Sequence, residues 1–440
     1  MSAAHQPIST AEADRAFAPL TRFDQLLVAV SGGSDSLALL VLIAEWHARC
    51  GGGAPRVFVA TVDHMLRETS AQEAAFVAEN CRRLGLDHTT LQWSEHKPWS
   101  GLSVAARTAR YALLEGHALS QGASGTTAVL TAHTEDDQAE TMIMRLKRGA
   151  GVVGLASIPA ERPVSRGSAI RLIRPLLNFP KSRLVGSLQV RGLTWWEDPT
   201  NTDSSYERVR VRSALKAWKN FGITSSSLAL SARRLRDSAD GIEYAAAQFR
   251  QTLALDFNNG VYARFDRQAF EAGPAILRQM VLAEVIASFG GLSPAPVLSE
   301  IEALTTRLAT VRESAATLGG AVVSWGSRYV RVWREMGRLT LPDLVLEAGN
   351  RQAWDARFWV SFNGSPKSPI RVKALGIAGY ASIAQSVPNG LQMPAGAAYA
   401  IPSFWTDGQL LGVPSLSILT SHEADLQLVS EPIRDEPAGY

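Results

Sequence analysis

Six small residues, Ser31-Gly32-Gly33-Ser34-Asp35-Ser36, interrupt an apolar stretch that continues as a helical pattern from Leu37. The glycines let the backbone turn sharply and approach a ligand closely, and the start of a following helix presents unpaired N–H groups to an anion. Three serine hydroxyl groups add hydrogen-bond donors. The pattern predicts a phosphate-binding loop between a buried strand and a helix.

Asp35 in this loop would repel a phosphate unless a divalent cation stood between them. The loop therefore predicts Mg²⁺ together with a nucleotide. The alternative is an ordinary strand-to-helix turn in which Ser34 or Asp35 is only the helix N-cap. The chain has no Gly-x-x-x-x-Gly-Lys-Ser/Thr motif, which excludes the lysine-containing phosphate loop.

The densest polar cluster of the N-terminal half runs from His133 to Thr141. If a helix starts at Glu135, Asp137 and Glu140 lie three residues apart on one face, where paired carboxylates could hold an ammonium group or a metal. Alternatively, these acidic residues only complement the dipole of a helix start. His133 beside them is a candidate for proton transfer.

Two arginines, Arg107 and Arg110, lie three residues apart in a helical pattern and could clamp a phosphate. A solvent-exposed basic surface is the alternative. Between Thr141 and Asp240 the chain carries 18 Lys and Arg residues against 7 Asp and Glu residues, a bias that suits a polyanion.

Within that basic region two pairs are candidates for contacts with nucleic-acid phosphates. Lys147 and Arg148 precede a glycine-rich loop, and Arg208 and Arg212 lie four apart and share one helix face.

Strand and helix patterns alternate through the first 150 residues, which predicts an α/β fold with a doubly wound parallel sheet. Ligands of such sheets bind at the carboxyl ends of the strands. Ser31, the pair Asp63-His64, and His133 all follow strands, so we expect them around one crevice. The expected strands are 26–30, 57–64, 88–93 and 128–133, and the expected helices are 36–49, 70–84, 103–120 and 135–148.

The 440-residue chain exceeds one ordinary domain. We expect residues 1–220 to form the α/β domain, 221–340 a mostly helical domain that ends in a hairpin, and 341–440 a small β-rich domain. No leader or membrane span is evident, so we expect the cytoplasm. The only cysteines, Cys50 and Cys81, form no Cys-x-x-Cys pair, which argues against a zinc ribbon or a redox centre.

Several of these motifs together resemble the bacterial tRNA(Ile)-lysidine synthetases, which belong to the PP-loop superfamily of N-type ATP pyrophosphatases. The resemblance covers most of the first domain and thins downstream to 317–320, 334–335 and 401–411. It rests on Ser31–Ser36, Val62–His64 with Leu66-Arg67, Ala106–Tyr111, His133–Thr141, Arg145–Leu155, Arg174–Leu177 and Asp198–Arg212.

The resemblance implies an ATP-dependent carbon–nitrogen ligase that joins lysine to C2 of the wobble cytidine of tRNA(Ile) with a CAU anticodon. ATP first adenylates the C2 oxygen and releases pyrophosphate, and the lysine amine then displaces AMP, so that the tRNA reads AUA and is charged with isoleucine. ATP and Mg²⁺ are the implied cofactors. The sequence leaves open whether the protein forms a homodimer.

The resemblance also implies roles for individual residues. Ser31–Ser36 with Asp63 and His64 bind ATP, Asp35 reaches Mg²⁺, and Asp137 and Glu140 hold lysine. The other expected catalytic residues are Arg107, Arg110 and His133, and the expected tRNA contacts are Lys147, Arg148, Arg208 and Arg212.

One departure from the family pattern is Val209, where the family usually has Asn. Among rivals, tRNA thiolation needs paired reactive cysteines, and GMP synthetase brings a glutaminase; neither set of parts is present. A non-catalytic tRNA-binding protein would need neither Asp35 nor the acidic cluster.

Overall fold

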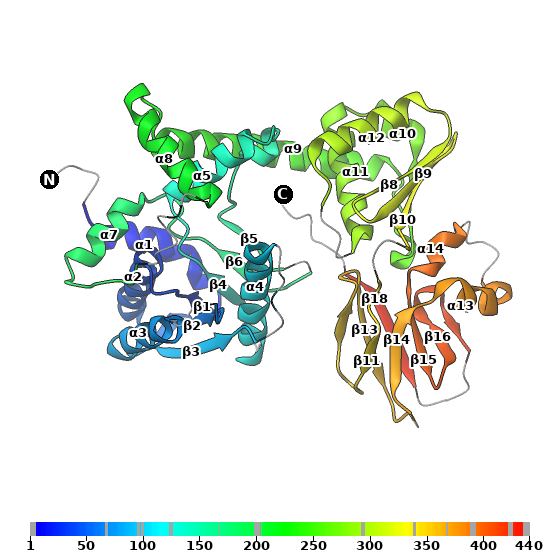
Figure 1. Ribbon diagram of the computed structural model, residues 1–440, viewed down its shortest axis with the longest axis horizontal. Coiled ribbons are helices and arrows are strands. Elements are labelled where there is room, and N and C mark those ends of the chain that lie inside the picture. Colours follow the sequence, from blue (N-terminus) through cyan, green and yellow to red (C-terminus); the bar gives the residue numbers. More distant parts are fainter. Residues whose placement is uncertain are drawn as a thin grey trace. The chain divides into compact units, whose positions relative to one another are not determined.

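The computed structural model divides the chain into two compact units, the first ending at Asp240 and the second starting at Gly241 (Figure 1). No helix among the described residues combines the length and apolar character needed to cross a membrane. The structure describes residues 6–66, 69–94, 97, 101–122, 126–165, 167–197, 203, 205–291, 295–337, 340–366, 368–387, 393–420 and 426–433.

The first unit is built on a six-stranded sheet with the strand order β3-β2-β1-β4-β6-β5. All neighbouring strands run parallel except β5, which is antiparallel to β6. This confirms the predicted parallel α/β sheet. The strands are β1 (Gln25–Ala29), β2 (Arg56–Asp63), β3 (Asp87–Gln92), β4 (Thr127–Leu130), β5 (Glu161–Pro163) and β6 (Arg171–Ile173).

Alternate residues of the central strand β1 face opposite layers of helices. Leu26 and Val28 join the core formed with α1, α2 and α7, whereas Leu27 joins the core beneath α4. Figure 1 shows α4 on the other side of the sheet from α1 and α2. The helices of this unit are α1 (Thr10–Phe17), α2 (Ser34–Cys50), α3 (Ser70–Arg83), α4 (Leu102–Ser120), α5 (Glu135–Leu146), α6 (Val152–Leu155), α7 (Lys181–Gln189) and α8 (Glu207–Trp218).

The chain reverses its direction of travel across the sheet beside β1. From β1 it adds β2 and β3 on one side and then crosses through α4 to β4 on the other side. A crevice for a ligand is expected at such a switch point, outside the carboxyl ends of β1 and β4. The loop 31–36 and the segment from His133 onward lie at these two ends.

The second unit begins with helices packed on an antiparallel sheet of order β7-β10-β9-β8. Its core contains Phe265, Phe270 and Phe289. The predicted hairpin is therefore part of a four-stranded sheet, because β7 pairs with β10 at one edge and β8 with β9 at the other. The elements are α9 (Ser225–Thr252), which starts in the first unit, β7 (Ala263–Asp266), α10 (Arg267–Ala272), α11 (Ala275–Gly290), α12 (Leu298–Thr310), β8 (Ser314–Leu318), β9 (Ala321–Trp325) and β10 (Tyr329–Arg334).

The remainder of the second unit contains two small sheets, β11-β14-β15-β16-β17 and β12-β13-β18, around a separate core with Trp354 and Phe404. This confirms the expected β-rich character beyond residue 341, whereas the two short helices were not expected. The elements are β11 (Leu344–Leu346), β12 (Gln352–Trp354), β13 (Phe358–Asn363), β14 (Ile370–Ala374), α13 (Gly376–Ile383), α14 (Ala395–Tyr399), β15 (Pro402–Thr406), β16 (Gln409–Val413), β17 (Ile418–Leu419) and β18 (Gln427–Pro432).

Candidate active site

The loop between β1 and α2 leaves the amino end of α2 without a side-chain cap. The N-cap is Gly33, and no side chain among the described residues caps it, so the alternative in which Ser34 or Asp35 is the cap is wrong. Gly32 has φ +86°, a conformation that favours glycine. The backbone N–H of Ser31 donates to Ser36 Oγ at 3.1 Å, and this hydroxyl donates to the Gly33 carbonyl at 3.0 Å. The loop is preorganised to receive an anion.

Asp35, in the first turn of α2, forms an ion pair with the side chain of Lys181. Its Oδ2 accepts a hydrogen bond from Lys181 Nζ at 2.8 Å, although the two residues lie 146 positions apart. Burial raises the pKa of the Asp35 carboxyl; Lys181 opposes this rise and Asp137 adds to it. The carboxylate is therefore placed to hold positive charge beside the loop.

The start of α5 brings the acidic cluster to the neighbouring strand end. Thr134 and Asp137 form a capping box, in which Asp137 Oδ2 accepts from the Thr134 backbone N–H at 2.9 Å. Asp136 Oδ2 accepts the backbone N–H of Lys181 at 2.8 Å. Both aspartates therefore act at helix starts, since Asp137 caps α5 and Asp136 accepts the N–H of the first residue of α7. Among the described residues nothing hydrogen-bonds to Asp137 Oδ1, so this oxygen can still accept a ligand.

Glu140, one turn further along α5, is enclosed by two arginines of α8. The two helices pack through Ala139, Val211 and Leu215, which sets Arg208 Nε 3.4 Å from Glu140 Oε2 and Arg212 Nε in contact with Oε1. The Glu140 side chain is only 3% exposed. Burial raises its pKa, and the hydrogen bond and charge of Arg212 oppose that rise.

Electrostatic coupling joins these groups into one site. Although burial alone would lower the pKa of Arg212, its bond with Glu140 raises it, and the charges of Asp137 and Asp35 add to the rise. The glycine loop and the acidic helix start therefore lie close together at one edge of the sheet, where the switch-point rule places a ligand.

The end of β2 contributes Asp63 and His64 to the same sheet edge. Asp63 Oδ1 accepts the backbone N–H of Met65 at 2.8 Å and so shapes the turn. Arg110 Nη2 lies 3.3 Å from His64 Nε2. Burial and the charge of Arg110 lower the pKa of His64 to about 4, so its ring is neutral at pH 7.

His133 lies on the opposite side of the loop, after β4. Its Nδ1 is 3.0 Å from Thr131 Oγ1. Burial lowers the pKa of His133 to about 3; Asp137 opposes this shift, and Arg174 and Arg107 strengthen it. Arg107 and Arg110 contact different side chains, since the Arg107 guanidinium lies over the Tyr111 ring.

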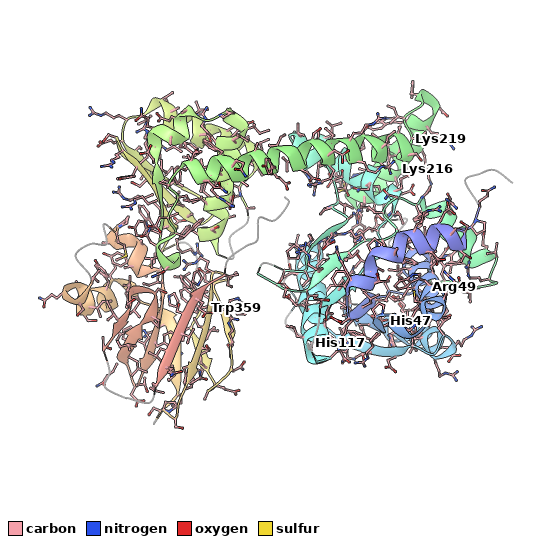
Figure 2. The ribbon with its side chains drawn as sticks, turned by 180° about the vertical axis from the view of Figure 1, so that it is seen from behind. His47, Arg49, His117, Lys216, Lys219 and Trp359 are labelled. Carbon is pink, nitrogen blue, oxygen red and sulfur yellow. The ribbon has the colours of Figure 1, made fainter. Side chains whose placement is uncertain are left out.

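The predicted tRNA contacts lie along α5 and α8. Lys147 and Arg148 both contact the Glu207 carboxylate, so this group of three keeps one positive charge. Figure 2 shows Lys216 and Lys219 at the other end of α8, and both side chains belong to exposed residues. From 208 to 236 the chain has eight Lys and Arg residues and no Asp or Glu. Residues 198–202, at the beginning of the matched segment Asp198–Arg212, lie outside the described residues.

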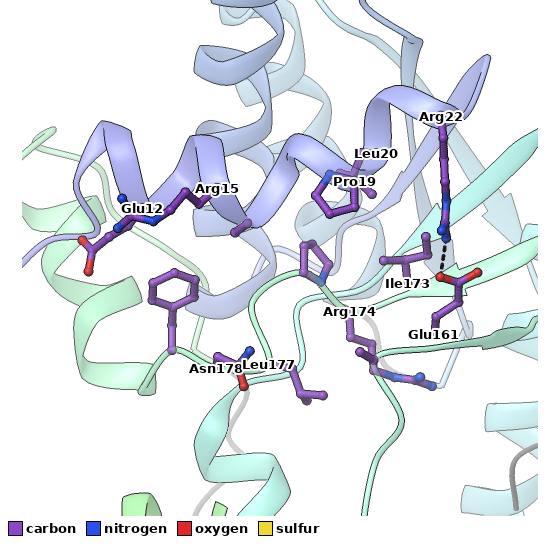
Figure 3. A pocket seen from close by; sticks show the side chains of 14 residues that line it. Glu12, Arg15, Pro19, Leu20, Arg22, Glu161, Ile173, Arg174, Leu177 and Asn178 are labelled. Atoms are coloured by element: carbon purple, nitrogen blue, oxygen red, sulfur yellow. Dashed lines mark hydrogen bonds and ion pairs between the residues drawn. The ribbon is translucent and has the colours of Figure 1, made fainter. Parts of the chain in front are cut away.

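A pocket of about 540 Å³ opens elsewhere on this unit (Figure 3). It lies between the N-terminal helical segment and the residues that follow β6, with Arg15, Pro19, Leu177 and Asn178 in its wall. None of the residues expected at the nucleotide or lysine site lines it.

Sequence reasoning missed Lys181 and Trp196. The Trp196 backbone N–H donates to the Gly32 carbonyl at 3.0 Å and so helps to fix the backbone of the glycine loop. Pro180 before a helical pattern was a usable signal for the start of α7, but no local signal links Lys181 to Asp35.

The two cysteines do not form a reactive pair. Cys81 is buried, and burial raises the pKa of its thiol to about 12. The described residues also include no group of three or more His, Cys, Asp or Glu side chains that could hold a metal.

Comparison with known proteins identifies relatives that all belong to one family. A family model described as a PP-loop domain matches residues 6–217. A tRNA(Ile)-lysidine synthase of Bradyrhizobium sp. strain BTAi1 is 42% identical over 347 residues, covering 74% of this chain and 95% of the relative. The enzyme of Ruegeria pomeroyi is 36% identical over 92% of this chain and 91% of its own. That of Bartonella henselae is 32% identical over 80% and 79%.

Proposed function

Because the chain belongs to the tRNA(Ile)-lysidine synthase family, we propose that the crevice between the glycine loop and the acidic start of α5 is its ligase active site. The family function is an ATP-dependent ligation. The observation that carries the assignment of the site is that Lys181 joins the two helix starts: its Nζ donates to Asp35 of α2 at 2.8 Å, and its backbone N–H donates to Asp136 of α5 at 2.8 Å.

The glycine loop would bind the phosphates of ATP. The N–H groups at the start of α2 have no side-chain cap and would be available to an anion. Asp35 fits a cation, because its carboxylate is half-buried, is repelled by Asp137 and already accepts a hydrogen bond from the Lys181 ammonium. Bound Mg²⁺ would neutralise charge on the phosphates. Arg110 beside His64 would stabilise the charge that develops on the α-phosphate when the cytidine C2 oxygen attacks it.

The acidic helix start would bind the lysine side chain. Asp137 has a carboxylate oxygen to offer to an ammonium group, whereas Glu140 already holds Arg208 and Arg212. We therefore assign the direct contact to Asp137 and a supporting role to Glu140. The ammonium must lose a proton before its nitrogen attacks C2 and AMP leaves. His133 is held neutral by burial, and an anionic nucleotide beside it would raise its affinity for that proton.

The assay of this reaction uses the purified protein with ATP, Mg²⁺, lysine and tRNA(Ile). We expect AMP release and the mass of one lysyl group added to a single cytidine. AMP formation that proceeds equally well without tRNA would contradict the assignment of the acceptor.

The lysine site is tested by Asp137→Asn, which should raise the KM for lysine about tenfold or more and change the KM for ATP little. The matched control is Thr134→Val, which removes the other half of the capping box and leaves the carboxylate in place. If Thr134→Val reproduces the lysine defect, Asp137 acts only through the helix start.

A further inference from the structure

Three arginines gather around Tyr111, on the side of His133 away from the glycine loop. The guanidinium carbon of Arg107 lies 5.2 Å from the centre of the Tyr111 ring, and that of Arg162 lies 5.4 Å from it. Arg174 follows β6 and is only 2% exposed. Its charge and that of Arg107 both act on His133.

These arginines have no carboxylate partner among the described residues. Arg162 donates to the carbonyls of Pro163 and Val164 at 3.1 and 3.5 Å, and Arg174 donates to the carbonyl of Pro159 at 2.6 Å. Neighbouring arginines differ, since Arg22 and Arg171 both pair with Glu161. Of the three, only Arg174 is buried; Arg162 is half-buried and Arg107 is exposed. Buried charges in proteins are normally paired, so a counter-anion is missing beside Arg174.

The charged form of Arg174 is destabilised by its burial and by the neighbouring arginines. Burial, with the charges of Arg162 and Arg107, lowers the pKa of Arg174 to about 10, and Tyr111 opposes this shift. Its Nε is buried and has no hydrogen-bond partner among the described residues.

We propose that Arg107, Arg162 and Arg174 bind a phosphodiester group of the RNA strand that carries the target base. This inference rests on the proposed function, because it takes tRNA as the substrate. Guanidinium groups match phosphate oxygens in geometry and charge, and an anion among the three would remove their mutual repulsion. Stacking on Tyr111 holds two of them ready, which reduces the entropy lost on binding.

The position of the cluster favours an RNA phosphate over the phosphates of ATP. The glycine loop follows β1, whereas Arg174 follows β6, and β4 lies between them. Two strand spacings amount to about 10 Å, which exceeds the distance between neighbouring phosphates of a triphosphate. Arg110 points to the other side, toward His64 at the end of β2, and is the arginine suited to ATP.

The test measures tRNA binding by Arg162→Met without ATP, between about 50 and 200 mM salt. Loss of one phosphate contact should weaken binding about tenfold and reduce the slope of log affinity against log salt by about one. The KM for ATP should stay within twofold of wild type. Arg171→Met is the matched control, because Arg171 lies on the paired strand and has Glu161 as its partner; its slope should equal that of wild type.

Arg162→Lys keeps the charge and removes the planar fork, and should show the wild-type slope with a weaker affinity. This variant carries the test if circular dichroism shows that Arg162→Met does not fold. An unchanged slope in Arg162→Met, or a raised KM for ATP with an unchanged slope, overturns the RNA assignment. Failure of the proposed function would look different, since wild-type protein would then release no tRNA-dependent AMP.

Discussion

Two clusters in this molecule have the same composition and differ in exposure. Each contains one carboxylate between two arginines: Glu140 with Arg208 and Arg212 in the first unit, and Asp355 with Arg334 and Arg357 in the second. The arginine side chains are 42% and 37% exposed in the first cluster. In the second they are 3% and 1% exposed.

The buried cluster is held by hydrogen bonds within the second unit. Arg334 Nε donates to Asp355 Oδ2 at 2.9 Å and its Nη1 to the Gly320 carbonyl at 2.8 Å, while Arg357 donates to Asp355 and to the Ala400 carbonyl. These bonds tie segments from three sheets together. The exposed arginines around Glu140 can exchange partners with water or substrate. The comparison teaches that burial of the cations, more than composition, separates a structural cluster from one that can take part in binding.

The largest effect is expected from Asp355→Asn. Two buried guanidinium groups would lose their counter-charge, which should lower the free energy of unfolding by about 3 to 5 kcal/mol. Urea unfolding followed by tryptophan fluorescence measures this loss. The control is Asp343→Asn, which breaks an exposed pair with Arg371 and should cost less than about 1 kcal/mol. Equal losses in the two variants would remove the contrast between buried and exposed clusters.

A smaller loss of stability and a larger loss of activity are expected from Glu140→Gln. Arg208 and Arg212 can turn to water, so the free energy of unfolding should fall by less than in Asp355→Asn. The kcat/KM for lysine should fall about 10- to 100-fold, because the field that supports Asp137 changes. Lysine titrations at saturating ATP check this expectation. A stability loss as large as that of Asp355→Asn, with lysine kinetics intact, would make both clusters structural.

The smallest expected effect is on the stability of the first unit at acidic pH. All described histidines lie in the first unit, and the pKa values of His133 and His64 are lowered to about 3 and about 4. Between these values and 6.5 the unfolded chain binds more protons, so each histidine lowers the stability of the first unit as pH falls below 6.5.

The contribution of His133 at pH 5 is at most about 2 kcal/mol, and the raised pKa values of Asp35 and Glu140 act in the opposite direction. Limited proteolysis of wild type and His133→Gln at pH 7 and pH 5 isolates the histidine. The rate of cleavage within the first unit should rise from pH 7 to pH 5, and this rise should be smaller in the variant than in wild type. Identical acid sensitivity would exclude His133 as its source.

Much of the first unit could be predicted because its central strands β1, β2 and β4 lie in apolar runs and its helices are periodic. The segments that were missed are short: β5 and β6 have three residues each, too few to show a period. The positions of Ser31, His64 and His133 could be predicted, because these residues follow strands. The site could not be predicted where partners are distant, as with Glu140 and Arg212 or Asp35 and Lys181, because local sequence carries no signal of such pairing.

Lys181 connects the two halves of the crevice without belonging to any recognisable motif. Its backbone is held by Asp136 at the start of α5, and its side chain reaches Asp35 at the start of α2. A change in length at this one position would therefore alter the separation between the proposed nucleotide and lysine sites, and with it the chance that the two substrates meet in a reactive orientation.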